Sequence, residues 1–208
     1  MPTLLSIKAS PRGSRSRAIT VADAFIAAYS QRENVKLVRR DLSSLNMTPF
    51  DESAVNAKYA VMHGTEMEID EHAAWLGITD WTTEFSRADV YAFAVPMWNF
   101  GIPYTLKHYF DLVIQPGLTF KYDPATGYEG LLKGKKAFVA LARGGEYAAG
   151  PAAGMDFQKP HIETMLRFMG VSDIHTVVIE PTILGTKELI EERLAKAVEA
   201  ATAIAAKF

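Results

Sequence analysis

Residues 90–103 read VYAFAVPMWNFGIP, and this stretch decides the fold. Val90–Val95 is apolar without interruption, and Pro96 lacks the backbone donor that would continue the strand. A short run of this kind is typical of a strand buried on both faces of a parallel sheet. The apolar spacing then predicts a helix over Pro103–Gln115, because proline is well tolerated in a first helical turn. A buried strand that leads into a helix is the repeating unit of an α/β protein.

The alternation of strand and helix continues in both directions from this stretch. Four further apolar runs predict strands at Leu4–Ile7, Val35–Asp41, Ala137–Ala142 and Thr176–Ile179. Helical spacing appears at Arg17–Gln31, Ala54–Met62, Glu66–Arg87, Ile162–Met169 and Lys187–Lys207. Gly170 is suited to end the fourth of these helices in a left-handed conformation. The sequence therefore predicts an α/β fold with a five-stranded parallel sheet and helices on both faces.

The longest stretch with no periodic pattern is Pro116–Lys135. Six of its residues are glycine or proline, yet it also carries three aromatic residues, Phe120, Tyr122 and Tyr128. We predict an irregular loop here. A loop of this length in a compact domain is usually functional, so these aromatic side chains are expected to line a small-molecule pocket.

Length, charge and composition exclude several classes of protein. The chain has 208 residues, which predicts a single domain over residues 1–208. It carries 22 Lys and Arg against 24 Asp and Glu, a net charge of −2, so we expect no nucleic-acid partner bound through phosphate neutralisation. The absence of cysteine excludes disulfides, cysteine-ligated zinc, iron–sulfur clusters and thiol catalysis. Any redox chemistry must come from a bound group.

No segment predicts a membrane span, a metal site or a hydrolase nucleophile. Apolar runs stay below the 18 or so residues that a spanning helix needs, and residues 1–10 predict a first strand in place of a signal peptide. We therefore expect a cytoplasmic protein without a membrane partner. The five histidines are scattered without metal-ligand spacing, the acidic residues at 66–71 are expected to be a solvated helix start, and no Gly-x-Ser-x-Gly motif is present.

Three unusual segments directly follow predicted strands: residues 10–16, 96–103 and 142–147. In a doubly wound sheet, ligands bind beyond the carboxyl ends of the strands, near the switch in strand order. The fold rule therefore brings the three segments to one edge of the sheet.

The first segment, SPRGSRS, is suited to a phosphate group. Hydroxyls of Ser10, Ser14 and Ser16, together with Arg15, precede a helix whose free N–H groups favour an anion. Neither a P-loop nor a Gly-x-Gly-x-x-Gly dinucleotide fingerprint is present, which points to a terminal phosphate. The alternative is that the serines only cap a helix in a plain polar loop.

The other two segments are suited to a flat ring. Trp98 and Phe100 lie on a loop stiffened by prolines, and Gly144-Gly145 allows close backbone approach beside Arg143. The alternatives are that the two aromatic side chains pack onto the core and that the glycines form an ordinary tight turn.

Together these motifs resemble the FMN-dependent NADH azoreductases, also described as NADH:quinone oxidoreductases, which have a flavodoxin-like fold. The resemblance covers nearly the whole chain in order. Its motifs are Ser10 with Ser14-x-Ser16, Pro96-Met97-Trp98-Asn99-Phe100, Lys107-x-Tyr109-Phe110-Asp111, Thr119-Phe120-x-Tyr122, Gly130-Leu131-x-x-Gly134-Lys135-Lys136-Ala137 and Arg143-Gly144-Gly145.

The resemblance implies one noncovalent FMN per subunit of a homodimer. Ser10, Ser14, Arg15 and Ser16 would hold the phosphate, and Pro96, Met97, Trp98, Asn99 and Phe100 would line the isoalloxazine ring. Ala142, Arg143, Gly144 and Gly145 would approach its pyrimidine side, and Phe120, Tyr122, Tyr128 and Tyr147 would line the substrate pocket. Two positions depart from the family pattern: Ala142 replaces a frequent serine, and His161 replaces a common aromatic residue.

The implied activity is hydride transfer from NADH or NADPH through FMN to a quinone or azo acceptor in a ping-pong mechanism. The flavin carries the chemistry, so no side chain is assigned as a catalytic residue. Two other functions stay open from the sequence: a noncatalytic flavin electron carrier of the flavodoxin type, and a nucleotide-binding regulator that never turns over. The low net charge disfavours the carrier, because such proteins often dock through a strongly acidic face.

Overall fold

The computed structural model describes residues 1–208 and contains one five-stranded parallel sheet. The strands are β1 (Thr3–Lys8), β2 (Lys36–Asp41), β3 (Val90–Pro96), β6 (Lys136–Ala142) and β7 (Asp173–Ile179). They lie in the order β2-β1-β3-β6-β7, which is the flavodoxin-like order with its switch between β1 and β3. The sheet predicted from the apolar runs is confirmed.

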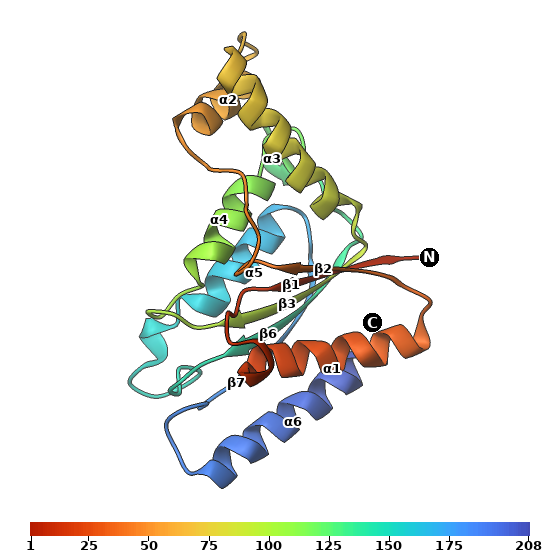
Figure 1. Ribbon diagram of the computed structural model, residues 1–208, viewed down its shortest axis with the longest axis vertical. Helices are drawn as coiled ribbons and strands as arrows, with labels where there is room; N and C mark the ends of the chain where they lie inside the picture. Colours follow the sequence, from red (N-terminus) through yellow and green to blue (C-terminus); the bar gives the residue numbers. More distant parts are fainter.

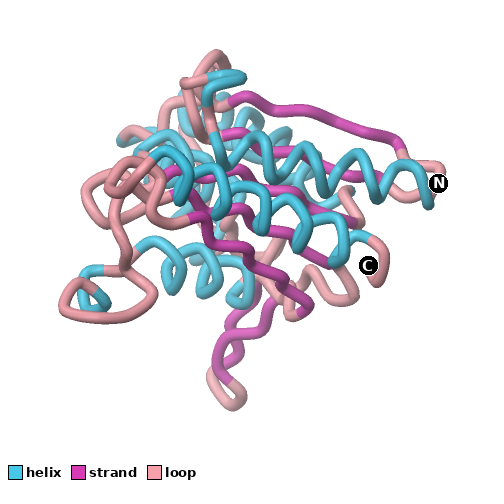
Figure 2. Tube along the Cα trace, turned by 90° about the horizontal axis from the view of Figure 1, so that it is seen from below, coloured by secondary structure: helices cyan, strands magenta, loops and turns pink.

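Helices cover both faces of this sheet, as predicted. α1 (Arg17–Arg32) and α6 (Lys187–Ala205) lie side by side on one face, and α4 (Tyr104–Val113) and α5 (Gln158–Phe168) lie on the other (Figures 1 and 2). α2 (Glu52–His63) and α3 (Ile69–Arg87) pack against each other and form a pair that extends away from the sheet (Figure 1).

The alternating side chains of β3 build the two halves of the core. Tyr91, Phe93 and Val95 pack in the cluster that includes the apolar stripes of α4 and α5. Val90, Ala92 and Ala94 point to the opposite face, where they pack in the cluster formed with α1 and α6. Small alanines on that face allow α1 to lie close to the strand, since there is little side-chain volume between the two backbones.

The prediction of an irregular loop over Pro116–Lys135 is wrong. This segment contains a hairpin of two antiparallel strands, β4 (Phe120–Asp123) and β5 (Gly127–Gly130), which projects from the body of the molecule (Figure 2). The Asp123 carboxylate accepts hydrogen bonds from the N–H groups of Ala125 and Thr126 and so closes the turn. Each strand has only four residues, too few for an alternating pattern to stand out against the surrounding glycines.

Candidate active site

The carboxyl edge of the sheet holds a cavity of about 200 Å³ with walls from all three predicted segments. Residues after β1, β3, β6 and β7 contribute, namely Ser10, Arg12, Ser16, Arg17, Pro96, Met97, Trp98, Ala142, Gly144, Thr182 and Ile183. The cavity therefore lies beside the switch point between β1 and β3, where the strand order places ligand sites.

Two buried polar atoms at this cavity have no hydrogen-bond partner within the chain. These are Ser10 Oγ, on a residue that is 1% exposed, and Nε of Arg17 in the first turn of α1. A buried donor without a partner is costly, so native proteins rarely keep one unless a ligand or water satisfies it. Both atoms lie where the N-terminus of α1 favours an anion, and the site therefore fits a phosphate group.

Ser16 caps α1 and also lines the cavity. Its Oγ accepts a hydrogen bond from Ile19 N at 3.4 Å, which leaves the hydroxyl proton free to donate. Ser14 and Arg15 lie elsewhere, on the exposed 3-10 turn η1 (Gly13–Arg15), and neither lines the cavity. The cationic side chains at the cavity belong instead to Arg12 and Arg17.

The loop after β3 forms a tight turn that holds two aromatic side chains outward. Trp98 and Gly101 exchange two backbone hydrogen bonds of 3.0 Å, and the two residues between them have positive φ angles, 46° at Asn99 and 68° at Phe100. Positive φ at both central positions is the requirement of a type I′ turn, and for phenylalanine it is strained. Such strain is concentrated at ligand sites.

This turn leaves backbone donors available and keeps the aromatic rings out of the core. The N–H groups of Asn99 and Phe100 donate to no acceptor of the chain, whereas Met97 N is bonded to Ala142 O at 2.8 Å. Trp98 is 38% exposed and Phe100 is 41% exposed, so the alternative that both rings pack onto the core is wrong.

The Gly144-Gly145 segment also presents free backbone donors. Neither N–H group is bonded within the chain, while the Gly144 carbonyl accepts from Ile183 N and Leu184 N. The next N–H groups, of Tyr147 and Ala148, donate to the Glu180 carboxylate at 3.0 and 2.8 Å. The Glu180 carboxylate therefore fixes this loop, and Gly144 lines the cavity.

The Arg143 side chain is buried behind this loop and is unavailable as a ligand group. Its guanidinium is 0% exposed and binds Asp156 at 2.7 Å, Glu180 at 3.2 Å and the side-chain oxygen of Gln158 at 3.0 Å. Gln158 in turn donates to the carbonyl of Val95 at 3.1 Å. This buried cluster joins the ends of β3, β6 and β7 to the start of α5.

The four aromatic residues expected in one substrate pocket are separated within the chain. Tyr147 lies at the carboxyl edge, with its ring 6.1 Å from that of Phe100 in an edge-to-face arrangement. Phe120, Tyr122 and Tyr128 lie on the β4–β5 hairpin, beyond the far end of α4. The ten residues of α4 span roughly 15 Å, so the hairpin and the carboxyl-edge cavity are distinct places in one subunit.

His161 lies on the outer side of the Trp98 turn. It lines a cavity of about 410 Å³ together with Trp98, Tyr104 and Lys107. Burial and the nearby Lys107 ammonium lower the pKa of His161, against the opposing effect of Asp111. This shift favours the neutral ring, which offers one donor and one acceptor to the cavity.

Thr182 and Ile183 also line the cavity, but the sequence did not identify them as site residues. They follow β7, and the rule that placed the other three segments applies to this strand as well. Residues 180–184 carry no serine, glycine pair or aromatic residue that would have drawn attention to them before the sheet order was known.

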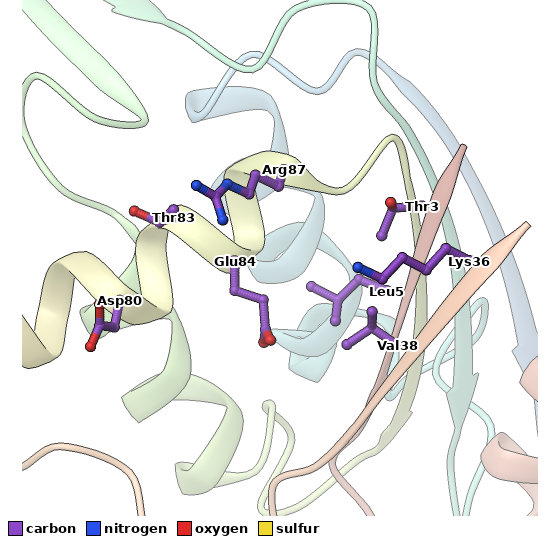
Figure 3. Close-up of a pocket in the computed structure, with 8 residues that line it drawn as sticks. All are labelled: Thr3, Leu5, Lys36, Val38, Asp80, Thr83, Glu84 and Arg87. Carbon is purple, nitrogen blue, oxygen red and sulfur yellow. The ribbon is translucent and has the colours of Figure 1, made fainter. Parts of the chain in front are cut away.

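A second cavity, of about 330 Å³, lies between α3 and the first residues of β1 and β2. Its lining residues are Asp80, Thr83, Glu84 and Arg87 from α3, Thr3 and Leu5 from β1, and Lys36 and Val38 from β2 (Figure 3). The Glu84 carboxylate forms an ion pair with Arg40 of β2, and this pair stabilises the contact between α3 and the edge of the sheet.

No group of three or more potential metal ligands is found in the chain, and no helix is both long and apolar enough to cross a membrane.

Comparison with known proteins agrees with this geometry. Residues 2–204 match a family model described as a flavodoxin-like fold. An FMN-dependent NADH:quinone oxidoreductase of Nitratidesulfovibrio vulgaris is 46% identical over 210 residues, which cover 100% of both chains. The chain belongs to this family.

Solved structures show the same likeness. An azoreductase from Bacillus anthracis str. Sterne has a TM-score of 0.92 and 30% identity, covering 100% of both chains. An FMN-dependent NADH-azoreductase from Bacillus anthracis str. Ames Ancestor, solved in complex with FMN, has a TM-score of 0.84 and 27% identity, and covers 99% of this chain and 100% of that one. The family membership predicted from the motifs is confirmed.

Proposed function

We propose that this chain is an FMN-dependent oxidoreductase that passes a hydride from NADH or NADPH to quinones and azo compounds. The observation that carries the proposal is the carboxyl-edge cavity, where buried Ser10 Oγ and Arg17 Nε have no partner at the start of a helix. The names of the Nitratidesulfovibrio and Bacillus relatives support the same activity.

In this proposal each wall of the cavity has a separate binding task. Ser10, Ser16 and Arg17 would hold the phosphate, whereas Ser14 and Arg15 lie on the exposed turn outside the cavity. The free N–H groups of Asn99, Phe100, Gly144 and Gly145 would donate hydrogen bonds to the ring and would stabilise negative charge on it. FMN, when bound, supplies the hydride chemistry. The protein fixes its position, while Trp98, Phe100 and Tyr147 border the space left for donor and acceptor.

A ring that lies against Met97 to Phe100 would leave one face open, and the expected kinetics follow from this arrangement. Donor and acceptor would occupy the same space in turn, so we expect a ping-pong mechanism with parallel double-reciprocal lines. No side chain at the cavity is needed as an obligatory acid, because solvent can supply the acceptor's proton. Steady NADH oxidation with a soluble quinone and no partner protein would distinguish this enzyme from a flavin electron carrier.

Cofactor identity and the phosphate site can be tested together. We expect the purified protein to be yellow and to release FMN on heating. Ser10→Ala and Ser16→Ala should each weaken FMN binding by roughly 1–3 kcal/mol, as expected for a lost charge-assisted bond. Ser14→Ala is the matched control, because Ser14 lies on the same segment outside the cavity. Release of FAD, a colourless protein, or equal losses in all three variants would contradict the proposal.

A further inference from the structure

The chain that enters α5 is bonded to both loops that carry free N–H donors. The Phe157 N–H group donates to the carbonyl of Phe100 at 3.0 Å, in the tight turn after β3. The Asp156 carboxylate and the Gln158 side-chain oxygen accept hydrogen bonds from the Arg143 guanidinium at 2.7 and 3.0 Å, directly before the glycine pair that follows β6. This short segment therefore joins the two loops, and none of its residues lines the carboxyl-edge cavity.

The two loops are not bonded directly to each other beyond the end of the sheet. The last bond between the two chain segments runs from Met97 N to the carbonyl of Ala142 at 2.8 Å. Past it, no backbone hydrogen bond joins residues 98–101 to residues 143–148. Apart from the edge-to-face contact of two aromatic rings, the spacing of the loops therefore depends on the segment that enters α5.

Gln158 is the side chain that connects the ends of β3 and β6 through this segment. It is 0% exposed, and both polar atoms of its amide have partners. Its Oε1 accepts a hydrogen bond from Arg143 Nε at 3.0 Å, and its Nε2 donates to the carbonyl of Val95 at 3.1 Å. Because each bond requires a defined distance and direction, the amide fixes the Arg143 side chain relative to the last residues of β3.

Stability alone does not account for a buried polar cluster at this position. The desolvation of a guanidinium and two carboxylates can exceed their mutual attraction, and apolar side chains of similar volume often stabilise a protein at least as well. A defined geometry is what apolar packing would not supply. The groups held in that geometry are the free N–H donors of Asn99, Phe100, Gly144 and Gly145.

We propose that Gln158 is a positioning residue, which holds the donors of the turn after β3 and those of Gly144-Gly145 at the spacing that stabilises negative charge on a bound flavin ring. This inference rests on the proposed oxidoreductase function. Donors that are already in place stabilise developing charge without the cost of reorganisation. Loss of their spacing should therefore weaken the binding of reduced FMN more than that of oxidised FMN, and so lower the midpoint potential of the bound cofactor.

Potentiometric titration of the purified holoprotein tests this role. The midpoint potential of bound FMN, compared with that of free FMN, measures the ratio of the affinities for the two redox forms. We expect Gln158→Leu, which removes both amide bonds from a side chain of similar size, to reduce the affinity for reduced FMN at least about tenfold more than that for oxidised FMN. This ratio corresponds to a fall of about 30 mV for a two-electron couple.

Gln115→Leu is the matched control for general destabilisation. Gln115 is also 0% exposed, and its amide donates to the carbonyls of Asp111 and Leu112 at 2.6 and 3.1 Å, near the far end of α4. The loss of these buried bonds should lower the Tm and leave the midpoint potential unchanged.

A second pair of variants tests the backbone part of the connection. Phe157→Pro removes the N–H group that donates to Phe100, whereas Phe157→Ala keeps it, and both remove the exposed ring. Proline is tolerated at the start of a helix. We expect the midpoint potential to be lower in Phe157→Pro than in Phe157→Ala.

An unchanged midpoint potential in Gln158→Leu, or a fall of the same size in Gln115→Leu, would overturn the inference. If Gln158→Leu does not fold, equal potentials in the two Phe157 variants overturn it instead. A wild-type protein that does not bind FMN would contradict the proposed function itself, so the two failures are distinguishable.

Discussion

At the scale of single residues, Arg143 holds three chain segments together behind the ligand site. Its fully buried guanidinium faces the Asp156 and Glu180 carboxylates, which are only 15% and 11% exposed. Glu180 also anchors the N–H groups of Tyr147 and Ala148, so the position of the Gly144-Gly145 loop depends on a neutralised carboxylate. The sequence predicts that Arg143 contacts the ligand. In the structure its side chain lies behind the Gly144-Gly145 loop and binds Asp156 and Glu180.

Replacing Arg143 should therefore destabilise the whole protein. Arg143→Met leaves two buried carboxylates without their cation, and we expect a loss of about 3–5 kcal/mol in the free energy of unfolding. Urea denaturation followed by circular dichroism measures this loss. Arg167→Met is the matched control: Arg167 is 53% exposed and contacts Glu163 at 3.5 Å, so its removal should cost less than about 1 kcal/mol. Similar losses in the two variants would contradict the assigned role of Arg143.

At the scale of elements, two glycines allow the β4–β5 hairpin to dock on the end of α5. α5 ends in a Schellman motif, with Val171 N bonded to Leu166 O at 3.0 Å and Gly170 at a φ of 100°. This confirms the predicted role of Gly170. A Cβ added to Gly130 would lie 2.1 Å from the backbone nitrogen of Gly170, so only glycine allows the two backbones to approach.

Gly130→Ala should consequently force the hairpin away from α5. Backbone atoms cannot yield as a flexible side chain can, and we expect a destabilisation of about 1–3 kcal/mol. Gly154→Ala is the control, because nothing lies within 4 Å of its added Cβ and its φ is not positive. Thermal unfolding of both variants measures the difference, and a Tm for Gly130→Ala equal to that of the control would refute the close approach.

The elements differ in how well the sequence could predict them. β3 and β6 were predicted to within one residue, because burial on both faces leaves a continuous apolar run. The hairpin was missed because its stability comes from contacts that are distant in sequence, such as the packing of Phe120 and Tyr128 on Phe168. α5 begins at Gln158, four residues before its predicted start, since Pro160 is accommodated in the first turn.

At the scale of the whole molecule, the strand order alone was enough to place the candidate site. Ser10, Met97 and Gly144 are far apart in sequence, yet the parallel order brings the ends of β1, β3 and β6 to one edge. Side-chain direction was not predictable in the same way. Ser14 and Arg15 do not line the cavity because they lie on the exposed 3-10 turn η1, and no sequence pattern specified that turn.

The rim of the carboxyl-edge site also predicts the state of assembly. Large apolar side chains are exposed on this side, including Tyr104 at 75%, Phe157 at 62%, Ile183 at 67% and Leu184 at 66%. A cluster of exposed apolar side chains of this kind is typical of a surface that another protein covers. The sequence resemblance implies a homodimer with its sites near the interface, and we expect this rim to form part of that interface.

Light scattering at micromolar concentration should accordingly give a mass twice the 22.9 kDa of one chain. Tyr104→Glu places a charge on the rim, where burying it without a partner is costly, and should shift the mass towards that of one chain. Ile69→Glu is the control, because Ile69 is 86% exposed at the start of α3, away from the rim. FMN affinity should fall in Tyr104→Glu alone if the partner helps to enclose the site. A monomeric wild-type protein would contradict the interface, and a dimer unaffected by Tyr104→Glu would place it on another face.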